Sequence, residues 1–143
     1  MKKLVAVIAL VAAAVSATAA LAAAHSTVWT AALSSGQEVP KQAVKDTAAH
    51  GQFKGTLKGS KLTWKLTFAK LTGPATAAHI HMAAKGKSGK VVVPLCGPCK
   101  SGQSGTATIS KALMTAFKKH LLYVNVHTAK NPNGEIRGQL AAG

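Results

Sequence analysis

Hydrophobic and polar residues alternate along most of the chain beyond about residue 25. The clearest case is 62–68, where Leu62, Trp64, Leu66 and Phe68 are separated by polar residues. Neighbouring residues of a β-strand point to opposite faces, so this pattern predicts a strand with one buried face. Residues 51–59 alternate in the same way, and Gly59-Ser60 between the two segments predicts a β-hairpin. The other predicted strands are 26–34, 78–82, 91–95, 106–109, 121–128 and 135–140.

A single segment has helical spacing. Ser110 can cap a helix over 111–119, in which Leu113, Met114 and Phe117 recur at the spacing of one helical face. The strand 91–95 is rich in valine, so we expect it to be buried and to end at Pro94. Many short strands, regular turns and one short helix predict an all-β fold, either an antiparallel β-sandwich or a Greek-key barrel.

Residues 1–24 have the features of a secretory signal peptide. Two lysines follow Met1, the run 4–15 is apolar, and small residues end at Ala24. We therefore expect one domain over 25–143, in a secreted or periplasmic protein without a transmembrane segment after cleavage. We expect that domain to be a monomer. Cleavage after Ala24 would place His25 at the N-terminus, where its imidazole and the terminal amine could chelate copper.

The chain is strongly basic, with a formal net charge of +15. Such a charge favours anionic neighbours, and an anionic envelope polymer or a lipid surface suits an exported protein. Export makes nucleic acid an unexpected partner. Because the lysines are scattered singly along the sequence, they could also serve only for solubility. The only acids are Glu38, Asp46 and Glu135, too few for a two-carboxylate glycosidase or an oxygen-rich calcium site.

Two predicted strands carry histidines that could meet. His79 and His81 are two residues apart, so they share a face of the strand 78–82. On the strand 121–128, His127 shares a face with Tyr123 and Asn125, while Val124 and Val126 face the core. If the two polar faces converge, three imidazoles can bind copper(II) or zinc(II). The expected hydrogen-bond partners that would orient the imidazoles are Glu38, Asn125 and Glu135.

The alternative is a metal-free polar network. The histidines would then form hydrogen bonds with Glu38, Asn125, Glu135 and Arg137, and Glu38 would pair with Arg137. The sequence favours this interpretation, a non-catalytic binding or structural module, with copper or zinc binding as the alternative. The feature that discriminates them is whether the three imidazoles converge. No Ser-His-Asp arrangement, phosphate loop or Gly-x-Ser-x-Gly motif indicates an enzyme.

The two cysteines form a Cys96-Gly97-Pro98-Cys99 motif. Thioredoxin-like redox chemistry needs the first thiol at a helix N-terminus in a βαβ framework, and this motif follows a predicted strand and precedes a Gly/Ser-rich loop. In an oxidising compartment, a local Cys96–Cys99 disulfide is the expected outcome. A thiolate metal site is the alternative.

Four motifs in order resemble the CHRD domain, which is named after chordin and also occurs singly in secreted bacterial proteins. They are Gly36-Gln37-Glu38-Val39-Pro40, Ala78-His79-Ile80-His81, Tyr123-Val124-Asn125-Val126-His127-Thr128 and Gly134-Glu135-Ile136-Arg137-Gly138-Gln139. The resemblance covers about residues 28–141 and implies an all-β extracellular domain. The Cys96–Cys99 segment is not part of that family pattern.

The chain is also similar, more distantly, to copper–zinc superoxide dismutase, a β-sandwich in which a His-x-His strand supplies copper ligands. That resemblance implies a superoxide-dismutase-like sandwich. It does not extend to a dinuclear site, because the chain has six histidines and Asp46 is its sole aspartate.

Overall fold

The computed structural model describes residues 25–41 and 48–143. The predicted signal peptide and Asp46 lie outside the described residues. The described chain forms one antiparallel sheet in the order β5-β4-β7-β8-β1-β2-β3-β6, with β9 paired to β1. The strands are β1 (Ser26–Ser34), β2 (His50–Lys58), β3 (Lys61–Ala69), β4 (Ala75–Met82), β5 (Lys90–Cys96), β6 (Gln103–Thr108), β7 (Leu122–Thr128), β8 (Ile136–Gln139) and β9 (Ala141–Ala142).

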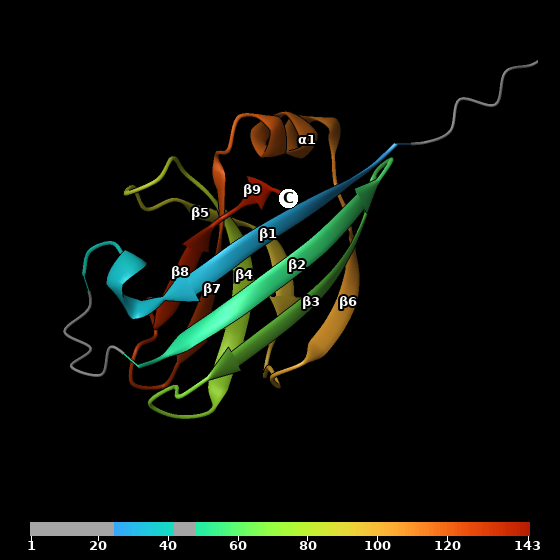
Figure 1. Ribbon diagram of the computed structural model, residues 1–143. Coiled ribbons are helices and arrows are strands. Elements are labelled where there is room, and N and C mark those ends of the chain that lie inside the picture. The colour runs from blue at the N-terminus through green and yellow to red at the C-terminus, as the bar shows by residue number, and fades with distance from the viewer. Residues whose placement is uncertain (1–24, 42–47) are drawn as a thin grey trace, which may run out of the picture.

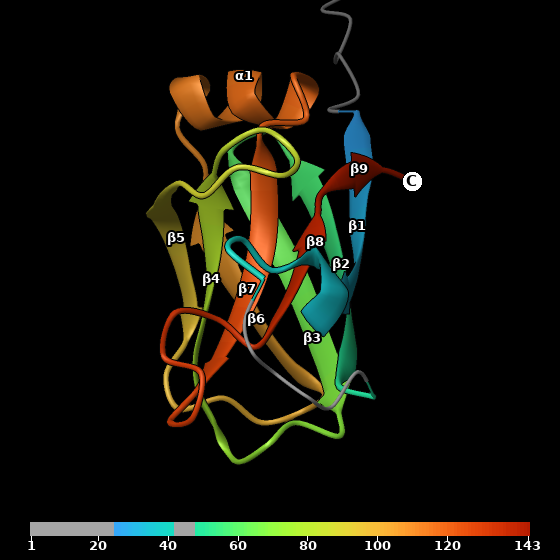
Figure 2. The ribbon, with the colours of Figure 1, turned by 90° about the vertical axis from the view of Figure 1, so that its left-hand side faces the viewer.

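The sheet folds into two layers. Strand β1 pairs with β8 only between Ser34 and Arg137, so the sheet can bend sharply between them. Strands β5, β4, β7 and β8 form one layer, and β1, β2, β3 and β6 form the other (Figures 1 and 2). The result is a nearly closed, barrel-like arrangement. The predicted all-β, sandwich-like fold with one short helix is confirmed for the described residues.

Large hydrophobic side chains from both layers fill the interior. Phe53, Leu66, Ile80 and Val124 are each at most 1% exposed. Burying one such side chain contributes roughly 1.5–3 kcal/mol. The alternation visible in the sequence therefore identifies the inner face of most strands correctly.

Helix α1 (Lys111–Lys118) covers one end of the two layers (Figure 1). The Ser110 hydroxyl accepts a hydrogen bond from the Leu113 amide, which confirms the predicted N-cap. Phe117 is buried against Trp29 of β1, with ring centroids 5.0 Å apart. This aromatic contact fixes the helix to the end of the core. A 3-10 helix, η1 (Ser35–Gln37), follows β1.

The β2–β3 hairpin forms as predicted, and Gly59 in its turn has a φ of +57°. The prediction of a buried strand that ends at Pro94 is wrong. Strand β5 continues to Cys96, and Val91 is 46% exposed. The reason is topological, because β5 is an edge strand, where proline is tolerated and one side lacks a neighbour. Strand β9 was not expected from the sequence.

The Cys96–Cys99 disulfide is present, with an S–S distance of 2.10 Å. It closes a four-residue turn after β5, and the Cys99 amide donates a hydrogen bond to the Ala75 carbonyl at the start of β4 (3.0 Å). The predicted disulfide is confirmed, and no free cysteine remains in the described chain to act as a thiolate ligand.

Strand β7 is buried on both faces. Val124 and Val126 face the core, as predicted. The opposite face carries Tyr123, Asn125 and His127, and it is covered by the segment after β1, by the β4–β5 loop and by the β7–β8 loop. These connections give the polar face of β7 a protected environment.

Candidate metal centre

The three histidines singled out from the sequence lie together. His79 and His81 come from β4, and His127 comes from the neighbouring strand β7. One nitrogen from each ring can be chosen so that all three lie within 4.8 Å of one another. The antiparallel register explains this, because His127 pairs with Ala77, two residues before His79. The convergence that discriminates the two interpretations of the sequence is therefore present.

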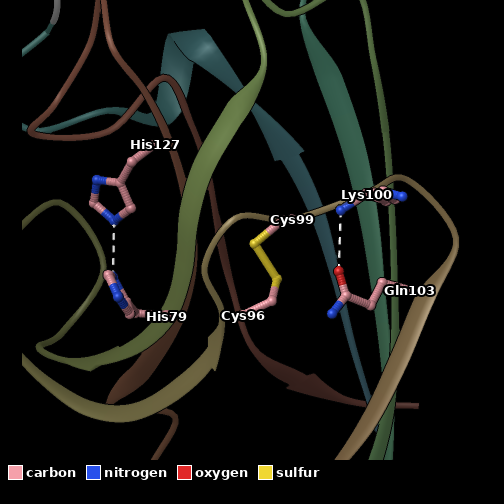
Figure 3. The surroundings of a disulfide bond; sticks show 6 residues. All are labelled: His79, Cys96, Cys99, Lys100, Gln103 and His127. Atoms are coloured by element: carbon pink, nitrogen blue, oxygen red, sulfur yellow. Dashed lines mark hydrogen bonds between the residues drawn. A yellow bond between two sulfur atoms is a disulfide. The ribbon is translucent and has the colours of Figure 1, made fainter.

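The closest pair is His79 and His127. The Nδ1 of His79 and the Nε2 of His127 are 3.1 Å apart, and a dashed line in Figure 3 marks this contact between the two tilted rings. Two nitrogens bound to one tetrahedral zinc at about 2.0–2.1 Å are themselves about 3.3 Å apart. The observed spacing is thus suitable for two ligands of one metal ion, and it also suits one hydrogen bond between the rings.

Backbone carbonyls orient two of the rings. The His81 Nδ1 lies 2.9 Å from the Gly89 carbonyl oxygen, and the His127 Nδ1 lies 3.0 Å from the Pro132 carbonyl oxygen. A carbonyl oxygen only accepts, so in both rings Nδ1 carries the proton and Nε2 keeps its lone pair. The His81 Nε2 is buried and has no hydrogen-bond partner in the described structure. Orientation of a ligating imidazole through its second nitrogen is typical of metal sites.

These orienting partners differ from those expected. The sequence predicts Glu38, Asn125 and Glu135 in this role, but the Nδ1 atoms of His81 and His127 are bonded to main-chain oxygens. Any residue type provides a carbonyl, so no sequence signal could have identified Gly89 or Pro132.

Position 89 nevertheless requires glycine. A Cβ at Gly89 would lie 1.8 Å from the Met82 carbonyl oxygen, which excludes every other residue without a backbone shift. The close approach of the loop to the end of β4 brings the Gly89 carbonyl to His81. The Tyr123 hydroxyl lies 3.1 Å from the Gly89 amide and 3.3 Å from its carbonyl oxygen, which further fixes the loop.

Burial keeps the three imidazoles neutral. It lowers the pKa of His127 to about 4, the Pro132 hydrogen bond opposes that shift, and the charges of the other two histidines add to it. Burial also lowers the pKa values of His79 and His81. Neutral imidazoles are the form that binds metals, so the site can hold a cation at pH 7 without first releasing a proton from a charged ring.

A stack of three side chains continues from the site across the polar face of β7. The His81 ring stacks on Tyr123 at 4.9 Å with an angle of 14° between the planes. The Arg137 guanidinium carbon lies 3.4 Å from the Tyr123 ring centroid, and its Nη2 donates to the Lys87 carbonyl oxygen (2.7 Å). Tyr123 is therefore held on both sides, and the Arg137 charge helps to keep His81 neutral.

Glu38 and Asn125 form a second polar group beside the stack. Asn125 Nδ2 donates to Glu38 Oε2 at 3.4 Å. Burial raises the pKa of Glu38 to about 7, although the nearby Arg137 charge and Asn125 oppose that shift. The predicted Glu38–Arg137 ion pair is not seen among the described residues. Glu38 accepts from Asn125 and Arg137 donates to the Lys87 carbonyl, while the Arg137 charge lowers the pKa of Glu38.

Glu135 belongs to a separate group and is fully buried. Its carboxylate accepts hydrogen bonds from the Thr72 amide and hydroxyl, from the Thr128 hydroxyl and from Asn131 Nδ2. Burial raises the pKa of Glu135, but these donors outweigh that effect and lower it overall. Glu135 joins the β3–β4 and β7–β8 loops, and its hydrogen bonds within the described structure go to residues other than the histidines.

Comparison with known protein families identifies the family of the chain. The CHRD domain profile matches residues 29–140, which is most of the chain. The chain belongs to the CHRD domain family. CHRD domains are typically extracellular, and membership supports a non-catalytic binding module in general. No curated protein and no solved structure matches the chain.

The CHRD match extends from Trp29 in β1 to Leu140 after β8, so it includes both histidine-bearing strands. In the part of this CHRD domain that the structure describes, no helix is both long enough and apolar enough to cross a bilayer.

Proposed function

We propose that this CHRD domain is an extracellular, non-catalytic module that binds one copper(II) or zinc(II) ion through His79, His81 and His127. The observation that carries the proposal is the convergence of three neutral imidazoles, two of them with Nδ1 bonded to a main-chain carbonyl. Three imidazole ligands with neutral rings suit either metal. This is the interpretation that the sequence left as the alternative.

The orphaned His81 Nε2 favours a metal over a purely structural network. A structural network of buried polar groups normally satisfies each of its members, and an unpaired buried acceptor costs about 1–3 kcal/mol. A metal ion would use that lone pair. His79 is only partly buried, which leaves a route from solvent to the cluster.

Three histidines leave at least one coordination position for water or an external ligand. The site therefore suits reversible capture of a metal ion, or coordination of an external ligand by the metal ion bound there. The predicted signal peptide over 1–24 and a secreted or periplasmic location are part of the same proposal, because they would place the site outside the cytoplasm.

Calorimetric titration of the full chain with copper(II) and with zinc(II) tests the proposal. The chain is expressed with residues 1–24 encoded, so that any processing occurs. We expect one ion per chain with micromolar or tighter affinity, and loss of that binding in His79→Ala/His81→Ala and in His127→Ala. Losing one of three ligands should weaken binding by at least about tenfold.

The matched control replaces two histidines outside the site. His50 is exposed, and His120 has a φ of +53°, so His50→Ala/His120→Asn removes two imidazoles and keeps a residue that tolerates this backbone conformation. This control should bind like wild type. Binding that survives loss of the His79/His81 pair would place the metal elsewhere, for example at His25, and contradict the proposal.

A further inference from the structure

The described surface carries no acidic side chain. Two of the three acids of the chain, Glu38 and Glu135, are 3% and 0% exposed, and Asp46 lies outside the described residues. All the lysines that the structure describes are exposed. The described surface is therefore cationic or neutral throughout, which attracts polyanions over about 8–10 Å at moderate ionic strength.

The β2–β3 hairpin gathers four of these lysines on one face. Lys54 pairs directly with Lys65, and Lys58 pairs with Lys61. The paired residues point to the same side, away from the core. Like charges directly opposite each other on neighbouring strands are destabilising, so this arrangement opposes folding. A binding partner that neutralises the charges gives a physical reason for it.

Hydroxyl groups fill the space between and beside the lysines. Thr56 pairs with Thr63 between the two lysine pairs, and Thr63 pairs in turn with Thr106 of β6. Lys65 pairs with Ser104 of β6. Figure 1 shows β1, β2, β3 and β6 side by side in this layer. A hollow of about 470 Å³ on this layer is lined by Thr30, Lys54, Thr56, Thr63, Lys65 and Ser104, among others.

The geometry suits an extended chain that carries negative charges at intervals. Lys54 and Lys58 are four residues apart, so the two lysine pairs are separated by about 13 Å along the hairpin. Across the hairpin, the paired side chains start about 5 Å apart. The threonine hydroxyls between the pairs can donate and accept hydrogen bonds, which suits the hydroxyl groups of a sugar.

We propose that this hairpin face, defined by Lys54, Thr56, Lys58, Lys61, Thr63 and Lys65, binds an extended anionic polysaccharide. The face lies on the layer opposite the histidines, so the proposal is independent of the metal centre. A lipid surface fits less well, because the large hydrophobic side chain exposed in the described structure is Val91, on β5 of the other layer.

The first test measures binding of the full chain to immobilised polygalacturonate by biolayer interferometry. The face variant is K54Q/K58Q/K61Q/K65Q. The matched control is K85Q/K90Q/K119Q/K130Q, which removes the same charge from exposed lysines outside the hairpin. We expect the face variant to lose at least about tenfold in affinity and the control to stay within about threefold. Equal losses in the two variants would show attraction by net charge alone and overturn the proposal.

Folding is checked by thermal unfolding of the same samples. Removing the like-charge pairs should leave the unfolding temperature of the face variant equal to that of wild type or higher, so a loss of binding with an intact fold supports the proposal.

A second variant tests the hydroxyl groups. T56V/T63V keeps the size and charge of the face, and it should weaken polygalacturonate binding without changing its salt dependence. Phosphatidylglycerol vesicles and duplex DNA are the competing probes. If T56V/T63V binds like wild type, or if vesicles or DNA bind as tightly as polygalacturonate, the assignment to a polysaccharide is overturned.

Discussion

Burial shifts the pKa values of Glu38 and His127 in opposite directions. It raises the pKa of Glu38 from 4.5 to about 7 and lowers that of His127 from 6.5 to about 4. The contribution of Glu38 to stability is therefore complete below pH 4.5 and is lost as the pH rises to about 7. The contribution of His127 is complete above pH 6.5 and is lost as the pH falls to about 4. Between pH 4.5 and 6.5 the two effects oppose each other.

Glu38→Gln removes one side of this balance. Glutamine keeps the shape of the protonated carboxyl but cannot ionise, so the Glu38 effect is removed while the His127 effect remains. We expect the free energy of unfolding of the variant, relative to wild type, to increase by about 1–3 kcal/mol between pH 5 and pH 8. Urea unfolding at pH 5, 6.5 and 8 in the presence of a chelator measures this difference. Parallel profiles for the two proteins would contradict the raised pKa of Glu38.

Local sequence spacing is sufficient to predict which histidines share a face. The two-residue spacing of His79 and His81 fixes their common side, and the pairing of β4 with β7 brings His127 to them. The carbonyls of Gly89 and Pro132 could not be predicted in the same way. Their position depends on the path of two loops, and main-chain oxygens leave no pattern in the sequence.

At the scale of elements, segments that depend on local signals were predicted best. The β2–β3 hairpin has both alternation and a turn at Gly59, and α1 has the Ser110 cap together with a hydrophobic face. Position within the sheet is a long-range property. The sequence therefore did not show that β5 lies at an edge of the sheet. It also did not show that lysines scattered along the chain lie together on one face of the β2–β3 hairpin.

The disulfide turn between β5 and β6 should contribute to stability without contributing to the metal centre. The Cys96–Cys99 bond closes a four-residue loop, for which loop entropy alone predicts a stabilisation of about 2 kcal/mol. We expect Cys96→Ser/Cys99→Ser to lower the free energy of unfolding by about that amount, measured with urea. Zinc affinity should be unchanged, because β7 still holds β4 in register. Loss of metal binding in this variant would show that the cysteines contribute to the site.

At the scale of the whole molecule, the two layers carry different chemistry. The β5-β4-β7-β8 layer holds the histidines on a polar face that is covered by loops. Its strand β7 also carries Asn125 and Thr128, which donate hydrogen bonds to the buried Glu38 and Glu135. The β1-β2-β3-β6 layer presents lysines and threonines to solvent. The two proposed sites therefore lie on opposite layers, so a metal ion at one would not obstruct a polymer at the other.

A crystal structure of the protein grown with zinc, with data collected on both sides of the zinc absorption edge, shows directly whether the three histidines bind a metal ion. We expect an anomalous difference peak about 2.0–2.1 Å from one nitrogen each of His79, His81 and His127. The Nδ1 atoms of His81 and His127 should remain bonded to Gly89 and Pro132. A structure with no peak at this position, in which His79 and His127 still share their hydrogen bond in saturating zinc, would contradict metal binding by these histidines.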